Sequence, residues 1–204
     1  MGLTERDLVV LKEIGRWRFM LSRHIKCLCD FPSARTADRR IKALVDAGYV
    51  ARQSVLYGVP RIYTLTSKGK ALLGLSRTPD KIRTERILHD IAVLDSVCYF
   101  MQKFYLPLEQ VKTEKELHRE DGFSNRKHHP DYVISYDGKI YAVEVELTPK
   151  ARGRMEKNIE SNYLNYDCQI WVIQGGDKIE RILNENKDTY PNISIQYIEA
   201  MKNA

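Results

Sequence analysis

The chain has 204 residues, 43% hydrophobic and 29% charged, which is enough apolar content for ordinary cores and excludes a wholly disordered chain. The length suits one large domain or two small ones. No segment approaches the ~20 apolar residues that span a bilayer, and the N-terminus lacks the features of a secretory signal. The four cysteines are too few and too scattered for a disulfide framework or a zinc site. We therefore expect a cytoplasmic protein with reduced thiols and no membrane contact.

The net charge of +6 is unevenly distributed along the chain. Residues 1–74 contain 14 Lys and Arg against 6 Asp and Glu, a net charge of +8. Residues 75–204 contain 19 Lys and Arg against 21 Asp and Glu, a net charge of −2. This asymmetry favours a polyanion-binding N-terminal domain joined to a different second domain. The alternative is a protein whose surface charge is merely uneven.

Residues 1–74 show the pattern of three helices followed by a β-hairpin and a further helix. Ser33 can cap the third helix and Gly48 can end it in a left-handed conformation. Gly58 and Pro60 mark the turn between two alternating segments. The expected elements are helices over 4–15, 22–31 and 33–47, strands over 49–56 and 61–65, and a helix from Thr66 or Ser67 to Leu73.

This order is that of a winged helix-turn-helix, whose third helix enters the major groove while the hairpin contacts a phosphate strand. Residues 63–69 also resemble the end of the wing in bacterial winged-helix regulators. An apolar stripe on the third helix leaves basic residues on its other faces. The predicted DNA contacts are Arg35, Arg39, Arg40 and Lys42 on this helix and Arg61 on the hairpin. Alternatively, these residues form a solvated helix face, or the domain contacts another protein.

Residues 75–80 are predicted to be a linker, and residues 81–204 a second domain of helices and strands. Its expected elements are a helix over 81–105, a strand over 110–113, a charged stretch over 114–121, a polar loop over 125–129, strands over 132–136 and 139–147, a helix over 148–166, a strand over 170–173, a helix over 177–186 and a strand over 193–198. A helix joining two strands implies a crossover connection, so we expect a mixed sheet covered on both faces.

Three carboxylates are predicted to converge in this sheet. Glu144 and Glu146 share one face of their strand, because side chains alternate with a period of two. Pairing about the Asp137-Gly138 turn places Asp131 opposite Glu144. Carboxylates this close repel one another unless a divalent cation lies among them. We therefore predict a metal site of Asp131, Glu144 and Glu146 that could activate water on a phosphodiester. The alternative is a half-solvated strand and ordinary turn chemistry.

Two further groups are less specific. Glu85 and His89 lie one turn apart on the expected long helix, where they either add to the metal site or face solvent. His128 and His129 do not match the His-apolar-His pattern of rolling-circle nickases, because adjacent residues of a strand point to opposite faces.

The Pro130-Asp131 and Glu144-Val145-Glu146 segments, within an αβββαβ order, resemble the PD-(D/E)XK nuclease superfamily, which has the restriction-endonuclease-like fold. The resemblance implies that Asp131 and Glu144 bind Mg²⁺ or Mn²⁺ and that Glu85 is the carboxylate of the first helix. Glu146 stands where most members have Lys, and Lys150 could supply the missing charge. A winged helix followed by such a domain also resembles the replication-relaxation proteins of plasmids and integrative elements.

These patterns predict an α/β protein with a winged-helix DNA-binding domain over 1–74, a linker over 75–80 and a PD-(D/E)XK nuclease-like domain over 81–204. We expect it to bind double-stranded DNA of a plasmid or mobile element and to make a metal-dependent cut or nick during replication or transfer. The alternative function is a non-catalytic regulator or replication accessory protein with a degenerate nuclease-like dimerisation domain. A third is an adaptor that contacts only proteins. Winged-helix proteins often bind palindromes as homodimers, although no segment here indicates a dimer interface.

Overall fold

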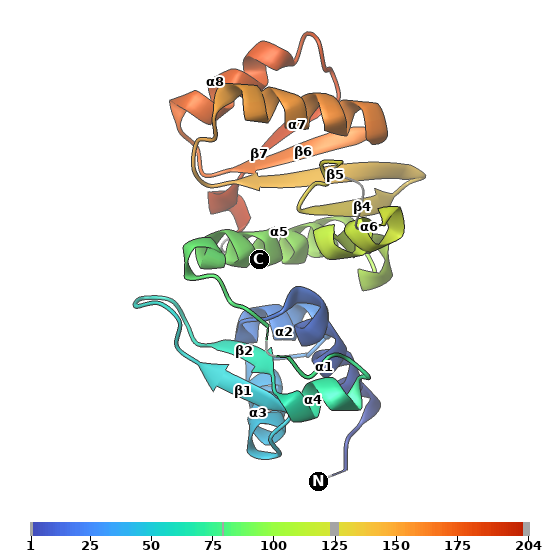
Figure 1. Ribbon diagram of the computed structural model, residues 1–204, viewed down its shortest axis with the longest axis vertical. Coiled ribbons are helices and arrows are strands. Elements are labelled where there is room, and N and C mark those ends of the chain that lie inside the picture. Colours follow the sequence, from blue (N-terminus) through green and yellow to red (C-terminus); the bar gives the residue numbers. More distant parts are fainter. Residues whose placement is uncertain (1, 79, 123–126, 202–204) are drawn as a thin grey trace. The chain divides into compact units, whose positions relative to one another are not determined.

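The computed structural model describes residues 2–78, 80–122 and 127–201 and shows a mixed α/β protein (Figure 1). The chain divides into two compact units, Met1–Leu94 and Asp95–Ala204, which are described separately. This division falls inside helix α5 (Ile87–Phe104). The predicted linker at 75–80 lies within the first unit, with residue 79 outside the described residues. All four cysteines are free thiols.

The N-terminal unit consists of three helices, an antiparallel hairpin and short helical segments. Their bounds are α1 (Glu5–Trp17), α2 (Ser22–Leu28), α3 (Ala34–Asp46), β1 (Val50–Gln53), β2 (Ile62–Leu65), α4 (Ser67–Leu72) and η1 (Thr84–Arg86). Strands β1 and β2 pair in antiparallel register, and Met20 adds an isolated bridge to Tyr63. The predicted sequence of three helices, a hairpin and a further helix is therefore confirmed.

Side-chain caps set several of these helix ends. Thr4, Ser33 and Thr66 each accept a hydrogen bond from a backbone N–H three residues later. Gly48 follows α3 with a φ of 76°, as predicted for a left-handed helix end. The prediction that Gly15 ends α1 was wrong, because α1 continues to Trp17. A Cβ on Gly15 would lie 3.0 Å from Leu65 of β2, so this glycine permits close packing of α1 against the hairpin.

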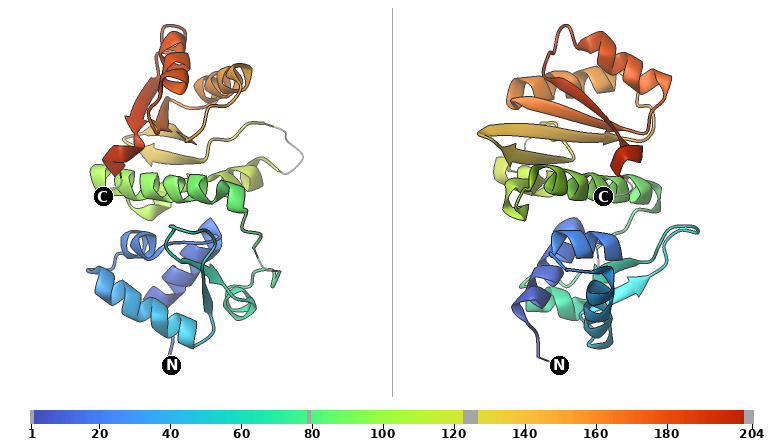
Figure 2. Two further views of the ribbon diagram at one scale, coloured as in Figure 1. Left: turned by 90° about the vertical axis from the view of Figure 1, so that its left-hand side faces the viewer. Right: turned by 180° about the vertical axis from the view of Figure 1, so that it is seen from behind.

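The C-terminal unit is built on one mixed sheet. Its elements, with α5 crossing from the first unit, are η2 (Leu108–Gln110), β3 (Val111–Thr113), α6 (Glu114–Asp121), β4 (Tyr132–Tyr136), β5 (Lys139–Glu146), α7 (Arg152–Asn165), β6 (Cys168–Ile173), α8 (Asp177–Asn186), β7 (Ile193–Tyr197) and η3 (Ile198–Met201). The strand order is β3-β4-β5-β6-β7, antiparallel from β3 to β5 and parallel from β5 to β7. Helices α7 and α8 cover one face, and the part of α5 within this unit covers the other (Figure 2). The mixed sheet with both faces covered is confirmed.

Each face of the sheet has its own core. Trp171 and Ile173 pack against Met155 and Ile159 of α7 and against apolar residues of α8. On the opposite face, the buried Tyr132 hydroxyl lies 2.8 Å from Ser96 Oγ of α5. Glu144 pairs with Trp171 in the parallel β5–β6 register, so its side chain lies on the α7 face.

The strand bounds in this part of the chain differ from the prediction by no more than two residues, and helices α5 and α7 differ more. Helix α5 begins at Ile87 rather than at residue 81, because the buried apolar stripe begins only there. Helix α7 begins after Ala151, so Thr148 does not cap it. The charged stretch 114–121 forms α6, which starts with a capping box of Thr113 and Glu116. Of the predicted polar loop, residues 125 and 126 lie outside the described residues.

Candidate carboxylate site and nucleic-acid interface

The β4–β5 hairpin brings Asp131 and Glu144 together. Its turn residues, Asp137 and Gly138, both have positive φ angles, as a two-residue hairpin turn requires. The register pairs Tyr132 with Val143, so Asp131, one residue before β4, falls opposite Glu144. The predicted register is confirmed.

Glu144 is a buried carboxylate whose hydrogen-bond partners are a histidine and an amide. Its side chain is 2% exposed, its Oε1 accepts from Asn162 Nδ2 at 3.0 Å, and His128 Nε2 lies 2.5 Å from the same oxygen. Burial raises the pKa of Glu144, the hydrogen bond with His128 opposes this shift, and the charge of Asp131 adds to it. The site therefore makes ionisation of Glu144 less favourable than that of a solvated carboxyl.

Glu146 has a different environment on the same strand. It is equally buried, and Lys150, which precedes α7, donates a hydrogen bond to its Oε1. Burial raises the pKa of Glu146, Lys150 opposes the shift, and Glu144 and Asp131 reinforce it. The structure thus places the positive charge of Lys150 directly on Glu146.

Asp131 is fixed against β5 by the backbone. Its Oδ2 accepts a hydrogen bond from the Val145 N–H at 2.8 Å. Asp131 and Glu144 thus lie side by side, whereas Lys150 binds Glu146.

The metal site of Asp131, Glu144 and Glu146 stays a prediction. Over residues 2–78, 80–122 and 127–201, no group of three or more His, Cys, Asp and Glu side chains is placed to hold a metal ion. Two carboxylates suit a hard divalent ion chemically, but Glu144 Oε1 and Glu146 Oε1 already have hydrogen-bond partners. We therefore derive no reaction step through a metal ion. A Mg²⁺ or Mn²⁺ requirement stays a prediction.

Two hydrogen-bond partners of Glu144 were not predicted from the sequence, and one predicted site residue lies elsewhere than expected. His128 lies three residues before Asp131. A histidine this close in sequence to a carboxylate is common in loops, so the spacing did not single out His128. Asn162 is 18 residues from Glu144, and no sequence motif links the two. They meet only because the crossover helix α7 carries Asn162 to Glu144. Glu85 is exposed in η1 of the first unit and precedes α5 rather than lying on it.

Helix α3 separates apolar and basic residues between two faces. Ala37, Ile41 and Leu44 are buried in the core of the N-terminal unit. Arg35, Arg39 and Lys42 are exposed, as is Arg61 at the start of β2. The expected apolar stripe is confirmed, and these basic side chains are accessible to a ligand.

Arg40 differs from its neighbours because it pairs with a buried carboxylate. Its Nε and Nη2 donate to the two oxygens of Asp7, which is fully buried on α1. Asp7 Oδ2 also accepts from the Thr4 N–H at 2.6 Å. Burial tends to raise the pKa of Asp7, but the hydrogen bonds from Arg40 and Thr4 outweigh it and hold the pKa below its usual value. Arg40 therefore links α3 to α1, a role the sequence analysis did not assign.

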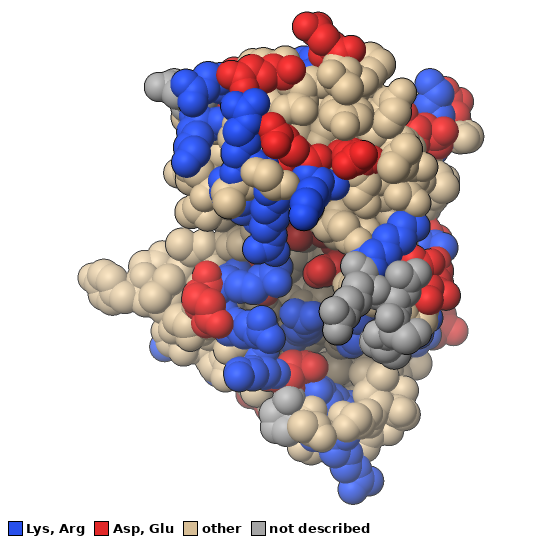
Figure 3. All heavy atoms as spheres, turned by 45° about the horizontal axis from the view of Figure 1, so that its top comes forward, with Lys and Arg blue, Asp and Glu red and all other residues tan. Residues whose placement is uncertain are grey.

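Charge on the α7–α8 face of the C-terminal unit is mixed. Figure 3 shows Lys and Arg side chains beside Asp and Glu side chains on this face. Arg152, for example, pairs with Glu156 at 2.8 Å and with Glu185 at 2.9 Å. Such pairs neutralise one another, so this face lacks the unbalanced basic character of α3.

By its fold, the protein belongs to the class of mixed α/β proteins and has two compact units. No protein-family model matches the chain, and no curated protein is significantly similar to it. No helix in the described part of the chain combines the length and apolarity needed to cross a membrane.

Proposed function

We propose that the protein binds double-stranded DNA through its N-terminal unit, acting as a winged helix. Helix α3 would enter the major groove, and the β1–β2 hairpin would follow the adjacent phosphate strand. The observation that carries this proposal is the outward face of α3, where Arg35, Arg39 and Lys42 are all exposed. The excess positive charge of residues 1–74 supports it, because phosphate neutralisation dominates DNA affinity.

The proposal is tested by the salt dependence of duplex binding, measured by fluorescence anisotropy. Each neutralised phosphate lowers the slope of log K against log salt by about 0.9. Arg39→Ala should weaken binding several-fold and, if Arg39 contacts phosphate, make the slope shallower by about one. Lys178→Ala is the matched control, since it removes one exposed charge from α8 in the other unit. Salt-independent binding, or equal effects of the two variants, would contradict the proposal.

A second candidate function is phosphodiester cleavage in the C-terminal unit. The observation that favours it is the buried Glu144 beside Asp131, with a histidine and an amide rather than Lys or Arg as its hydrogen-bond partners. Strongly perturbed carboxylates in such positions are candidates for catalysis. Together with the proposed winged helix, and on the resemblance of the sequence to replication-relaxation proteins, we propose a role in replication or transfer of a plasmid or mobile element.

Supercoiled plasmid incubated with the protein and Mg²⁺ or Mn²⁺ tests this candidate. We expect relaxed or linear product from the unmodified protein and none from Glu144→Gln. Lys139→Ala, at the exposed opposite end of β5, should retain cleavage. If the plasmid stays intact under conditions where DNA is bound, the non-catalytic regulator or accessory protein becomes the better description. An alternative homodimerisation role for this unit would then be measured by sedimentation.

A further inference from the structure

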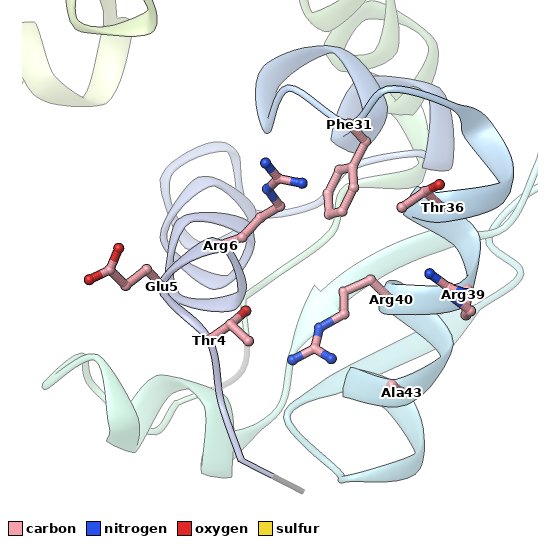
Figure 4. A pocket seen from close by; sticks show the side chains of 8 residues that line it. All are labelled: Thr4, Glu5, Arg6, Phe31, Thr36, Arg39, Arg40 and Ala43. Carbon is pink, nitrogen blue, oxygen red and sulfur yellow. The ribbon is translucent and has the colours of Figure 1, made fainter.

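A groove of about 720 Å³ lies in the N-terminal unit, between the first turn of α1 and the outer side of α3 (Figure 4). Arg6 and Thr4 line it from α1, and Arg39, Arg40 and Thr36 from α3, with Phe31 between. Neither the DNA contacts proposed for α3 nor the carboxylate site uses the α1 wall of this groove.

Two guanidinium groups extend into the groove from opposite walls. Figure 4 shows Arg6 reaching from α1 toward Phe31 and Arg40 reaching from α3 toward Thr4. The guanidinium carbon of Arg6 lies 5.3 Å from the centre of the Phe31 ring, within cation–π range. Glu5, the acidic residue in the lining, points away from the groove. The groove therefore carries the positive charges of Arg6 and Arg39, whereas the charge of Arg40 is paired with that of Asp7.

Arg40 is already fixed in position before any ligand binds. Its two hydrogen bonds to the buried Asp7 use two of the five N–H groups of the guanidinium. The remaining N–H groups keep a set orientation, because the guanidinium is planar and the Asp7 contact is bidentate. Such preorganisation lowers the entropic cost of binding an anion.

Fixed guanidinium donors are suited to phosphate oxygens. Arg39 belongs both to this groove and to the exposed face of α3. We propose that the groove binds a phosphate group, supplied by the DNA strand that borders the major groove occupied by α3. This inference rests on the proposed DNA binding. A free nucleotide carries the same phosphate chemistry, so the experiment separates the two sources.

The test compares Arg6→Ala with Lys12→Ala in the full-length protein. Both residues are exposed on α1, but Lys12 lies outside the groove lining. Duplex binding is measured by anisotropy at several salt concentrations and on several sequences. We expect Arg6→Ala to weaken binding several-fold, about equally on every sequence, and to make the salt slope shallower by about one. Lys12→Ala should leave the slope unchanged.

A second measurement titrates inorganic phosphate and adenosine monophosphate into the protein without DNA, by calorimetry. Nucleotide binding that Arg6→Ala abolishes, with an unchanged DNA salt slope, would assign the groove to a free nucleotide and overturn the DNA-strand source. Equal behaviour of Arg6→Ala and Lys12→Ala in both measurements would refute phosphate binding by the groove, while the proposal that α3 binds DNA would stand. Failure of the unmodified protein to bind DNA would instead refute the proposed function, and the calorimetry would still decide whether the groove binds phosphate.

Discussion

Asp7 and Glu144 are two buried carboxylates whose pKa values are shifted in opposite directions. Asp7 receives hydrogen bonds from Arg40 and from the start of α1, which lower its pKa although burial acts against them. Glu144 is also buried, but its partners His128 and Asn162 do not outweigh burial and the nearby Asp131, so its pKa is raised. The charge of Asp7 therefore stabilises the fold, whereas the charge of Glu144 costs folding free energy.

Arg40→Ala should destabilise the protein by about 2 kcal/mol near pH 7, because it leaves the buried charge of Asp7 without its cation. A carboxyl whose folded pKa is lowered contributes stability above its unfolded pKa and loses it as the pH falls through the folded value. The difference between Arg40→Ala and the unmodified protein should therefore shrink below about pH 4. Urea unfolding across pH measures this, with exposed Arg39→Ala as the control. A pH-independent difference would argue against an electrostatic role for Arg40.

At the level of elements, the sequence predicts features whose cause is local. The hairpin turn at Asp137-Gly138 fixes the β4–β5 register, and the cap at Ser33 with Gly48 fixes the bounds of α3. Both depend on residues within a few positions of each other, which is why spacing alone finds them. Helix α6 was missed because its apolar contribution to the core is a single buried Leu117 and its start depends on a capping box.

The sequence does not predict contacts made between elements. Asn162 reaches Glu144 only because the β5–α7–β6 crossover places α7 over that strand. In the sequence, nothing distinguishes Arg40 from the other basic residues of α3, because its partner Asp7 belongs to α1. The placement of Asp131 beside Glu144 was predictable from the strand register. The hydrogen bond from Lys150 to Glu146 was not, because it depends on where α7 begins.

For the whole molecule, charge and chemistry are divided between the two units. The basic surplus lies in residues 1–74, and Glu144 and Glu146, the two carboxylates whose pKa values are raised, lie in the C-terminal unit. If recognition and cleavage are separated in this way, a change at one site should leave the other function intact. Glu144 is the best residue for this test, since its substitution should raise stability, abolish cleavage and leave DNA binding unchanged.

Glu144→Gln should raise the free energy of unfolding at pH 7, because burial disfavours the charged form of Glu144. A carboxyl with a raised folded pKa binds more protons when folded, so its ionisation reduces stability as the pH rises from the unfolded pKa through the folded one. Glutamine keeps an oxygen that accepts from Asn162 but cannot ionise. The gain should therefore disappear below about pH 4, where the unfolded carboxyl is also protonated.

Urea unfolding at several pH values measures this gain, with exposed Glu160→Gln on α7 as the control. Duplex affinity should be unchanged in both variants, because both substitutions lie in the C-terminal unit, while plasmid cleavage should be lost only in Glu144→Gln. Proteins commonly retain such destabilising groups at functional sites, where stability is exchanged for activity. A variant that is less stable than the unmodified protein at every pH would show instead that the pairing of Glu144 with His128 serves the fold, and the argument for chemistry at this position would lose its physical basis.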